Sequence, residues 1–510
     1  LVFERAEVSR AEAQQVFRDD PLKLERLAEL GEDEVISTYR DGDFVDLCRG
    51  PHVHDTGWLK HFKLLHTAGA YWRGDSKRQS LQRIYATAFF KKDDLDRDLF
   101  RREEAKKRDH RVLGRTLDLF HFFPQSPGAA FWTPRGTVLY NTLVEFVRER
   151  QADAFQEVKT PLIYTKLLWE QSGHWGKYRE NMFLILDNES GEHDMSLKPM
   201  NCPSHYLYYG ASKHSYRELP LRLTTMDVLH RNELSGALSG LTRVRQFAQD
   251  DCHVFLAEEQ IAGEVRFLLD FILGHYATFG LSATLKFATR PEQRIGSDAL
   301  WDRAEAGLRA ALEATGMPYE LKAGDGAFYG PKIDFDVTDS IGRTWQLGTI
   351  QLDYVAPERF DLKYTGADNV PHRPVVIHRA VCGSFERFLA ILIEHFAGNF
   401  PLWLAPEQVA VIPISPELAE YGQRVADALK AAGLRASFDP HDEEDYRVRI
   451  REASVLKVPY MAVLGRREAE AGTVTVRRRG QEKRQDTLPL DAFVARLAEE
   501  ARTRALAPAD

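Results

Sequence analysis

The chain has 510 residues, of which 44% are hydrophobic and 28% charged, and its formal net charge is −8. This length predicts about two to four domains, and the composition is typical of a folded, water-soluble protein. No uncharged apolar run reaches the roughly 18–20 residues that a membrane helix needs, and no basic-then-apolar leader is present. Four widely separated cysteines, Cys48, Cys202, Cys252 and Cys382, argue against a disulfide framework. We therefore expect a cytoplasmic protein with no membrane partner.

Residues 1–95 are predicted to form a small α+β unit. Apolar residues at helical spacing predict a helix over 11–30, and short extended pieces follow at 35–39 and 44–47. A charged helical segment over 91–107 then leads, by about residue 110, to a longer domain.

Residues 110–401 contain helices and strands in runs and not in strict alternation. Helical periodicity is clear at 135–153, 257–279 and 298–315, and strand-like pieces occur at 282–287, 333–337 and 344–351. This order favours an antiparallel sheet with helices packed on it, an α+β fold.

A proline-bounded stretch at 400–406 is interpreted as a linker, after which the pattern changes. Strands are predicted at 409–414, 434–438, 460–464 and 473–477, and helices at 416–433, 446–456 and 490–504. Alternating strands and helices predict a three-layer α/β domain over residues 402–510.

Two basic segments, 101–115 and 477–484, offer local surfaces for a nucleic acid although the whole chain is acidic. A solvated charged face explains each of them equally well. The sequence alone leaves both interpretations open.

Cys202, His253 and His378 are residue types that bind zinc, and three protein ligands with an open position are typical of a functional zinc site. Their wide spacing is weak support, because a buried free cysteine and two unrelated histidines give the same pattern. Arg231, Arg243 and Arg387 could converge on a triphosphate, since guanidinium groups bind phosphate oxygens in a bidentate fork. No GxxxxGK[ST] loop and no GxGxxG after a strand is present.

The sequence segments around these residues are more specific evidence than their spacing. KPMNCPSH at 198–205 resembles the cysteine-bearing signature of threonyl-tRNA synthetases. LHRNELSG at 229–236 with LTRVRQFAQDDCH at 241–253 resembles motif 2 of class II synthetases, VIHRAVCGSFERF at 376–388 resembles motif 3, and EVKTP at 157–161 resembles the dimer-forming motif 1. Further family-like strings lie at 289–298, 328–333 and 345–351, so the similarity covers essentially the whole chain.

The resemblance implies a class II catalytic domain over 110–401 and an anticodon-binding domain over 402–510. It implies that Cys202, His253 and His378 hold one Zn²⁺ per subunit, and that ATP acts with Mg²⁺. Arg231 would bind the α-phosphate and Arg387 the γ-phosphate. The other residues implied in ATP binding are Glu233, Arg243, Gln346 and Phe247. Of these, Phe247 would stack on adenine.

Threonine would be bound by five residues, Gln249, Asp251, Tyr329, Gln351 and Ser384. His174 and Lys332 would join the two motif arginines in catalysis, with His174 assisting attack by the terminal ribose hydroxyl. In the C-terminal domain, Glu468 and Arg477 correspond to positions that contact anticodon bases. The implied partners are threonine, ATP, tRNA(Thr) and a second copy of the chain.

An open zinc site explains the choice of threonine. A site built to bind a hydroxyl discriminates against valine, which lacks one, by a factor of about 10⁴–10⁵. Serine keeps the hydroxyl and lacks only one methyl group, so the same site discriminates against serine by only about 10–200-fold. A hydrolytic editing site is therefore expected.

The string DLCRGPH at 46–52 resembles the second half of the bacterial editing domain, with Asp46, Cys48 and His52 as pocket residues. A chance Cys-x-x-x-His pair near a turn is the alternative. The family's earlier His-x-x-x-His element does not occur in residues 1–40, and the first residue is leucine. We expect a fragment or processed product that carries a partial editing domain and edits Ser-tRNA poorly.

Other functions fit less well. The set of Cys202, His253 and His378 argues against a synthetase for another small amino acid such as serine or proline, since the proline enzyme would not need a hydroxyl-sensing metal here. Loss of Arg231 or Arg387 would indicate a non-catalytic synthetase-like RNA-binding protein, and both are present. A zinc hydrolase would need a general-base carboxylate in a motif such as HExxH, which is lacking. The sequence therefore predicts a threonine–tRNA ligase.

Overall fold

The computed structural model describes residues 1–75, 77–440, 444–481 and 484–506. The chain divides into two compact units, Leu1–Glu104 and Ala105–Asp510. Within the described ranges, no helix combines the length and hydropathy that crossing a bilayer requires.

The first unit contains a three-stranded antiparallel sheet of β1 (Glu4–Val8), β2 (Ile36–Asp41) and β3 (Phe44–Leu47). The single helix predicted over 11–30 is wrong, because the chain forms α1 (Arg10–Val16) and α2 (Pro21–Glu29). Pro21 cannot continue α1, and Asp20 caps α2 by accepting from the N–H groups of Leu22 and Lys23.

A long hairpin of β4 (His61–Tyr71) and β5 (Ser80–Phe89) follows, and the sequence interpretation missed it. Its strands are exposed on most positions, so they lack the half-buried alternation that identifies a strand. α3 (Lys92–Arg108) matches the predicted charged helix and contains the boundary between the two units.

An eight-stranded sheet forms the centre of the second unit, in the order β17-β16-β18-β19-β22-β15-β12-β8. Its strands are β8 (Gln156–Glu157), β12 (Leu221–Thr225), β15 (Asp251–Leu256), β16 (Ser282–Ala288), β17 (Tyr319–Lys322), β18 (Lys332–Thr338), β19 (Thr344–Asp353) and β22 (Val375–Ala380). The six central strands are antiparallel as expected, whereas β17 and β8 join the edges in parallel, so the sheet is mixed.

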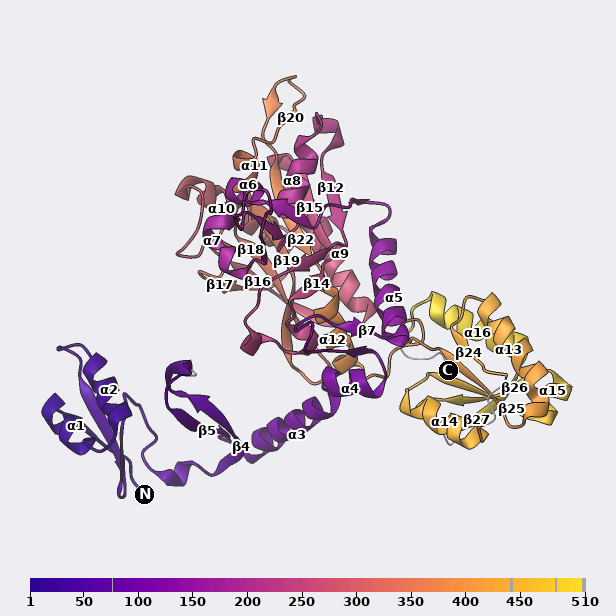
Figure 1. Ribbon diagram of the computed structural model, residues 1–510, viewed down its shortest axis with the longest axis horizontal. Coiled ribbons are helices and arrows are strands. Elements are labelled where there is room, and N and C mark those ends of the chain that lie inside the picture. Colours follow the sequence, from indigo (N-terminus) through magenta and orange to yellow (C-terminus); the bar gives the residue numbers. More distant parts are fainter. Residues whose placement is uncertain (76, 441–443, 482–483, 507–510) are drawn as a thin grey trace. The chain divides into compact units, whose positions relative to one another are not determined.

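Helices cover one face of this sheet and enclose the main hydrophobic core (Figure 1). They are α5 (Pro134–Gln151), α9 (Ile261–Thr278), α10 (Asp298–Glu313) and α12 (Phe385–His395), together with the short α4 (His110–Thr116). Side chains alternate between the faces of a strand, so Cys252 and Val254 enter this core whereas Asp251 and His253 face the other side.

The opposite face carries shorter elements. They are α6 (Lys166–Ser172), α7 (His174–Lys177), α8 (Cys202–Gly210), α11 (Val355–Arg359) and the sheet of β9 (Ile163–Thr165), β10 (Leu184–Ile185) and β11 (Met195–Leu197). α8 packs on β15 and β22 through a second apolar cluster that includes Tyr206, Phe255 and Val376. The hairpin of β13 (Val228–His230) and β14 (Gln246–Ala248) encloses the loop predicted to hold ATP.

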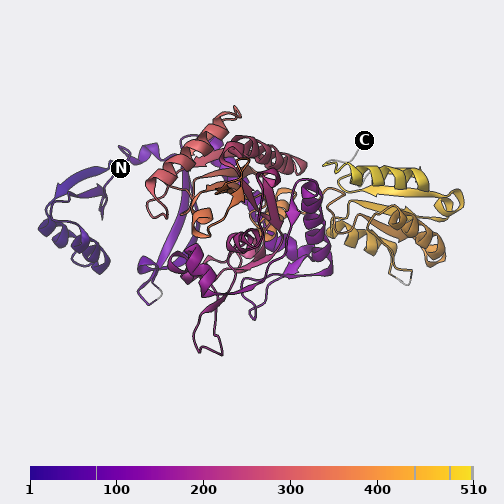
Figure 2. The same ribbon diagram turned by 90° about the horizontal axis from the view of Figure 1, so that it is seen from above.

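The C-terminal region is a three-layer α/β fold, as predicted. Its sheet has the order β24-β23-β25-β26-β27, from β23 (Val409–Pro413), β24 (Ala436–Ser437), β25 (Tyr460–Leu464), β26 (Thr473–Arg478) and β27 (Gln485–Pro489). α13 (Ala419–Ala431) and α16 (Leu490–Arg502) pack on one face and α14 (Tyr446–Val455) on the other, and Figure 2 shows helices on both sides. β27 and α15 (Arg466–Ala471) were not predicted.

The segment 400–406 is not the exposed linker that its prolines suggested. Phe400, Trp403 and Leu404 are buried in the main core, and the Trp403 ring lies 5.3 Å from that of Phe146. Leu402 belongs to the C-terminal core. Residues of this one segment therefore belong to both cores of the second unit.

Candidate active site

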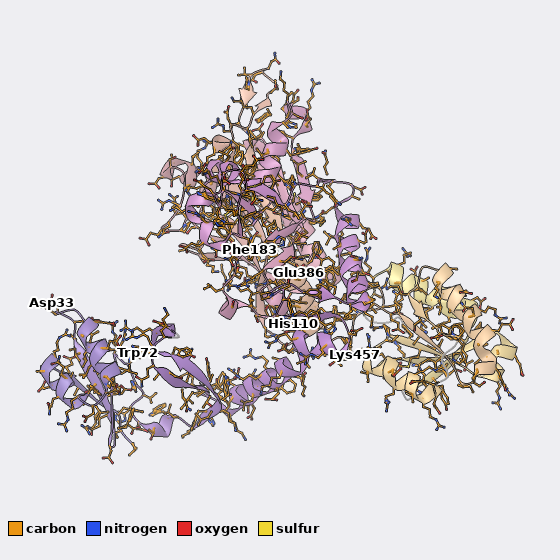
Figure 3. All side chains as sticks on the ribbon, in the orientation of Figure 1. Asp33, Trp72, His110, Phe183, Glu386 and Lys457 are labelled. Atoms are coloured by element: carbon orange, nitrogen blue, oxygen red, sulfur yellow. The ribbon has the colours of Figure 1, made fainter. Side chains whose placement is uncertain are left out.

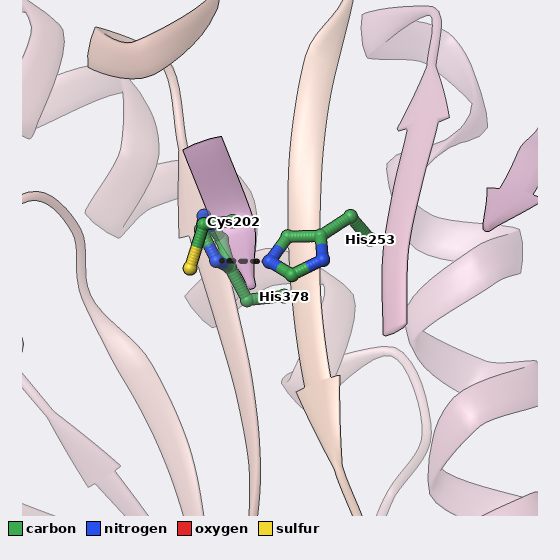
Figure 4. A group of neighbouring side chains, drawn as sticks. All are labelled: Cys202, His253 and His378. Carbon is green, nitrogen blue, oxygen red and sulfur yellow. Dashed lines mark hydrogen bonds between the residues drawn. The ribbon is translucent and has the colours of Figure 1, made fainter. Parts of the chain in front are cut away.

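Cys202, His253 and His378 converge on the face of the sheet opposite the main core. His253 on β15 and His378 on β22 are direct register partners, and Cys202 is in the first turn of α8 (Figure 4). The Nε2 atom of His253 lies 3.1 Å from Nδ1 of His378, and one potential ligand atom from each of the three residues lies within 4.8 Å of the others. All three side chains are buried. The structure therefore assembles the predicted donor set.

The remaining nitrogen of each histidine is held by another side chain. Nδ1 of His253 lies 2.8 Å from Nδ1 of His205, and Nε2 of His378 lies 3.0 Å from a carboxylate oxygen of Asp353 and 3.0 Å from the Tyr206 hydroxyl. Histidines that bind metals are usually oriented by such partners.

The sequence interpretation missed these partners. Two spacings could have signalled them: His205 follows Cys202 by one helical turn, and Asp353 follows Gln351 by two positions on one strand.

Burial sets the protonation of this cluster. It lowers the pKa of His253 well below its usual value and raises the pKa of the Cys202 thiol well above its own. His253 therefore presents a free lone pair at neutral pH, and Cys202 keeps its proton until a cation displaces it. One thiolate and two imidazoles suit zinc among the biological metals.

A small cavity lies beside the cluster. Its walls come from α6, α7, α8, β19, β22 and the loop before β18, and include Cys202, His378, His174, Phe328 and Tyr329. The Tyr329 hydroxyl donates to Gln351 at 2.5 Å, and Asn201 donates to Asp251 at 3.1 Å. Burial raises the pKa of Asp251 to about 6, a shift that the hydrogen bond from Asn201 reduces. The predicted threonine residues Asp251, Tyr329 and Gln351 thus lie around the group of Cys202, His253 and His378.

His174 is buried at the start of α7, where Nδ1 lies 2.8 Å from the Ser172 hydroxyl and Nε2 3.1 Å from the Met200 sulfur. Burial, with help from nearby positive groups, lowers its pKa to about 4. The imidazole is therefore neutral at physiological pH.

A second, open cavity of about 330 Å³ is lined by all six predicted ATP residues, Arg231, Glu233, Arg243, Phe247, Gln346 and Arg387. Gln249 and Ser384, which were predicted to bind threonine, line this cavity as well. The Arg231 guanidinium lies 5.0 Å from the centre of the Phe247 ring, and Arg243 pairs with Glu233 at 2.9 Å.

Arg387 is half-buried in this cleft. Burial and the neighbouring Arg243 lower its pKa, and its Nε has no hydrogen-bond partner among the described residues. Ser384 caps α12 by accepting from the Arg387 N–H at 3.1 Å, which fixes the start of that helix. A polyanion would supply the missing partners.

Two predicted residues hold other positions. Lys332 lies on β18 opposite Gln351, but its ammonium contacts Asp334 at 2.9 Å and it lines neither cavity. Gln249 donates to the Gly383 carbonyl at 2.5 Å, so it joins β14 to the turn before α12 and borders the ATP cleft.

A buried ion pair that the sequence interpretation missed aligns the two strands beneath the sites. Arg379 contacts Asp250 at 2.9 Å, and both side chains are fully buried. Asp250 also accepts from the N–H groups of Val381 and Cys382, which precede the cleft residue Ser384. A single carboxylate therefore holds the turn before α12 against the start of β15.

In the first unit, Asp46 and Cys48 line a cavity of about 400 Å³ with residues of α2 and β2. The His52 Nε2 lies 3.1 Å from the Cys48 sulfur, and its ring stacks on Tyr39 at 4.1 Å. The three predicted residues of this segment thus lie close together.

The C-terminal residues are arranged differently. Both carboxylate oxygens of Glu468 are engaged within the fold, one by the Gly465 N–H at 2.9 Å and the other by the Thr475 hydroxyl at 2.8 Å. Arg477 lies on β26 between Met461 and Gln485. Part of the basic segment 477–484 lies outside the described residues, namely 482–483.

Comparison with known proteins assigns the chain. Residues 183–396 match the family model "tRNA synthetase class II core domain (G, H, P, S and T)", residues 408–500 match "Anticodon binding domain", and residues 36–85 match "Threonyl and Alanyl tRNA synthetase second additional domain". The threonine–tRNA ligase of Myxococcus xanthus is 56% identical over 98% of this chain and 78% of its own length. The chain belongs to the threonine–tRNA ligase family.

Solved structures agree with that assignment. The RNA binding domain of threonyl-tRNA synthetase from Cryptosporidium parvum is 44% identical, with a TM-score of 0.74 over 77% of this chain and 98% of its own. A putative threonyl-tRNA synthetase from Aeropyrum pernix is 27% identical, with a TM-score of 0.66 over 79% and 97%.

This threonine–tRNA ligase is therefore a class II aminoacyl-tRNA synthetase that joins threonine to tRNA at the expense of ATP with Mg²⁺.

Proposed function

We propose that Cys202, His253 and His378 bind one Zn²⁺ per subunit and that this site selects threonine by its hydroxyl group. The donor set, its burial and the partner atoms on His253 and His378 support the proposal. Zinc with three protein ligands keeps open positions, and would accept the amino and hydroxyl groups of threonine. The observation that carries the proposal is the position of two of these donors, Cys202 and His378, in the wall of the cavity that also contains Tyr329.

The chain's own side chains would complete threonine binding. Asp251 presents a buried carboxylate for the amino group, and the Tyr329–Gln351 pair presents a polar edge close to the cluster. Each of these residues is fixed by a strand or by a hydrogen bond before substrate arrives. Binding therefore costs little reorganisation.

Adenylate formation would follow from charge compensation in the open cleft. Arg231 would bind the α-phosphate and Arg387 the γ-phosphate, with Arg243 and Glu233 bordering the nucleotide and Phe247 under adenine. The threonine carboxylate attacks the α-phosphorus, a P–O bond forms, and pyrophosphate leaves with its electron pair. Arginines that neutralise this charge contribute most of the rate, and the step requires no protein nucleophile.

Transfer to tRNA would use His174. Its neutral imidazole lies in the wall of the threonine cavity and can accept a hydrogen bond from the ribose hydroxyl that attacks the adenylate. We place Lys332 in the same step only if its side chain leaves Asp334, because its ammonium is held there.

The proposal is tested by ATP–pyrophosphate exchange with the full chain and threonine, serine or valine, before and after chelation of the metal. We expect exchange with threonine to disappear on chelation and to return with added Zn²⁺, with weak exchange for valine throughout. Unchanged exchange by a protein shown by elemental analysis to be metal-free would overturn the zinc assignment.

Several further predictions accompany this one. We propose three domains at 1–95, 110–401 and 402–510, with Asp46, Cys48 and His52 as editing residues, and Glu468 and Arg477 as anticodon contacts. Homodimer formation, a cytoplasmic location and weak editing by residues 1–510 stay predictions. Sedimentation tests the dimer, and deacylation of Ser-tRNA tests editing, where hydrolysis well above the buffer rate would contradict us.

A further inference from the structure

His110 connects three segments of the second unit that lie far apart in the sequence. It is the first residue of α4 (Figure 3) and is buried, with 4% of its surface exposed. Glu394, near the end of α12, lies beside it. Its backbone N–H donates to Glu394 at 3.0 Å, and its Nδ1 lies 2.7 Å from the same carboxylate oxygen. On the other side of the ring, Nε2 accepts from the Leu241 backbone N–H at 3.0 Å.

These partners define the state of the ring. A backbone N–H can only donate, so Nε2 of His110 carries no proton and Nδ1 carries the proton that faces Glu394. The ring is thus a neutral relay of hydrogen bonds from the motif 2 loop to α12.

Asp109, His110 and Glu394 have the composition of a metal site, but their atoms are otherwise engaged. Asp109 accepts three hydrogen bonds from the Arg111 side chain, and the free lone pair of His110 accepts from the Leu241 N–H. This cluster is therefore a structural junction.

The loop that contacts His110 is the one that reaches the ATP cleft. Gly240 has a φ of +51°, and a Cβ atom at this position would lie 2.2 Å from Nε2 of His110. Leu241 is fully buried, and the next two residues, Thr242 and Arg243, line the cleft. The imidazole thus fills the space under the loop and fixes the backbone just before the cleft.

Glu394 extends the same junction to a second wall of the cleft. Its other oxygen pairs with Arg343 at 2.6 Å, and the Arg343 guanidinium lies 5.2 Å from the centre of the Trp345 ring. Trp345 immediately precedes Gln346, which lines the cleft. Hydrogen bonds from His110 and the charge of Arg343 lower the pKa of Glu394 in spite of its burial. One ionised carboxylate therefore ties α4, α12 and the start of β19 together.

We propose that His110 is a positioning residue for nucleotide binding: through its hydrogen bond to the Leu241 N–H it holds the 240–243 loop in the conformation that places Arg243 and Thr242 in the cleft. The inference rests on the proposed role of this cleft in binding ATP. The start of α4, directly after α3, would thus influence the affinity for ATP and would have no influence on the threonine cavity.

Two substitutions separate the two hydrogen bonds. His110→Gln can place an amide oxygen near the position of Nε2 and accept from Leu241, whereas His110→Asn can only replace Nδ1 and its bond to Glu394. Losing a partner for a buried N–H costs roughly tenfold in an equilibrium constant. In ATP–pyrophosphate exchange we expect His110→Asn to raise KM for ATP about tenfold, with KM for threonine and zinc content unchanged. We expect His110→Gln to stay within about threefold of the parent.

Gly240→Ala approaches the same contact from the loop. We expect it to raise KM for ATP as His110→Asn does, and the double variant to be no worse than the worse single one, since both remove a single interaction. His395→Gln is the matched control: His395 is the next residue after Glu394 and accepts from the Ser340 N–H at 3.1 Å, but no hydrogen bond links it to the motif 2 loop. It should leave KM for ATP unchanged.

Outcomes that contradict the inference are distinct from failure of the cleft assignment. A rise in KM for ATP in His110→Gln with none in His110→Asn would overturn the inference, as would equal rises in KM for threonine. Arg387→Ala is measured in the same series. If it weakens exchange while His110→Asn and Gly240→Ala have no effect, the positioning role alone is wrong; if Arg387→Ala also has no effect, the cleft is not the ATP site.

Discussion

The cavity around the metal donors and the ATP cleft are neighbours built on different principles. His253 and His378 are register partners on adjacent strands, and Gln351 lies beside His378 in the same ladder. In the cleft, Arg243 belongs to a loop and keeps 58% of its side chain exposed, whereas the His253 side chain is fully buried. The site proposed to recognise one hydroxyl is held by neighbouring strands of one sheet, whereas the site proposed to bind ATP combines strand and helix residues with the more exposed loop of Arg243.

The two sites also differ in the charges that they contain. Beside Cys202, the imidazoles of His253 and His174 are neutral, because burial lowers their pKa values. This site therefore favours coordination of a metal over ion pairing. The cleft contains three arginines, of which Arg387 has an Nε atom without a hydrogen-bond partner among the described residues. Selectivity is therefore expected to depend on the first site and charge compensation on the second.

The strongest test of the comparison is Cys202→Ala. Without the thiolate the donor set cannot hold its metal, so discrimination between threonine and valine should collapse from about 10⁴ toward the few-fold level of shape alone. The discrimination is measured as the ratio of the ATP–pyrophosphate exchange rates with threonine and with valine, and the zinc content of the variant is determined alongside. Cys252→Ala is the matched control, because Cys252 is equally buried on β15 but faces the main core. Retained discrimination in Cys202→Ala would place selectivity elsewhere.

Arg231→Ala tests the second site. Removing one preorganised cation from the reacting phosphate should lower kcat/KM for exchange by about 10²–10³, while zinc content and the preference for threonine stay unchanged. Arg266→Ala, which removes an exposed arginine paired with Asp270, is the control. A change in amino-acid preference in Arg231→Ala would mean that the two sites are not separable.

Asp353→Asn should have a smaller effect that is confined to the first site. The amide would place a donor group or a weaker acceptor against Nε2 of His378, and loss of such a partner costs about 10–100-fold in metal affinity. Competition with a zinc chelator measures it. Asp339→Asn changes a similarly buried carboxylate that caps a turn far from the donor set, and should leave zinc affinity unaltered.

The last test concerns the stability of the fold instead of substrate binding. Glu386, labelled in Figure 3, accepts from the Ala248 N–H at 3.1 Å and so holds β14, the strand of Phe247, to α12. Burial raises its pKa from 4.5 to about 7, so the folded state binds a proton more tightly than the unfolded state does. The contribution is fully present below pH 4.5 and is lost as the pH rises toward 7, in total on the order of 3 kcal/mol.

Glu386→Gln should therefore flatten the decline of Tm between pH 5 and pH 8, because the amide does not titrate. Calorimetry of both proteins across this range provides the measurement. Equal slopes would show that another group is responsible for the pH dependence.

Much of this protein could be predicted from its residues. Periodicity located α5, α9, α10 and three of the central strands, β16, β18 and β19, because these segments pack against one core and repeat their apolar residues at the spacing of a helix or strand. The local sequence motifs pointed to Cys202, His253 and His378, and the structure brings these residues together. Where a segment lacks that spacing, as in β4 and β5 with their exposed positions, prediction failed.

The sequence by itself determined the family, the order of the domains and the residues that we propose to meet the substrates, because motifs are local. Only the tertiary structure decided that His205 and Asp353 hold the metal-facing histidines, that Asp250 and Arg379 align two strands, and that His110 supports a loop 131 residues away. It also decided that Lys332 pairs with Asp334 and that the segment 400–406 is buried. Each of these depends on which strands are neighbours and which faces meet, and pairing between distant segments leaves no periodic trace in either one.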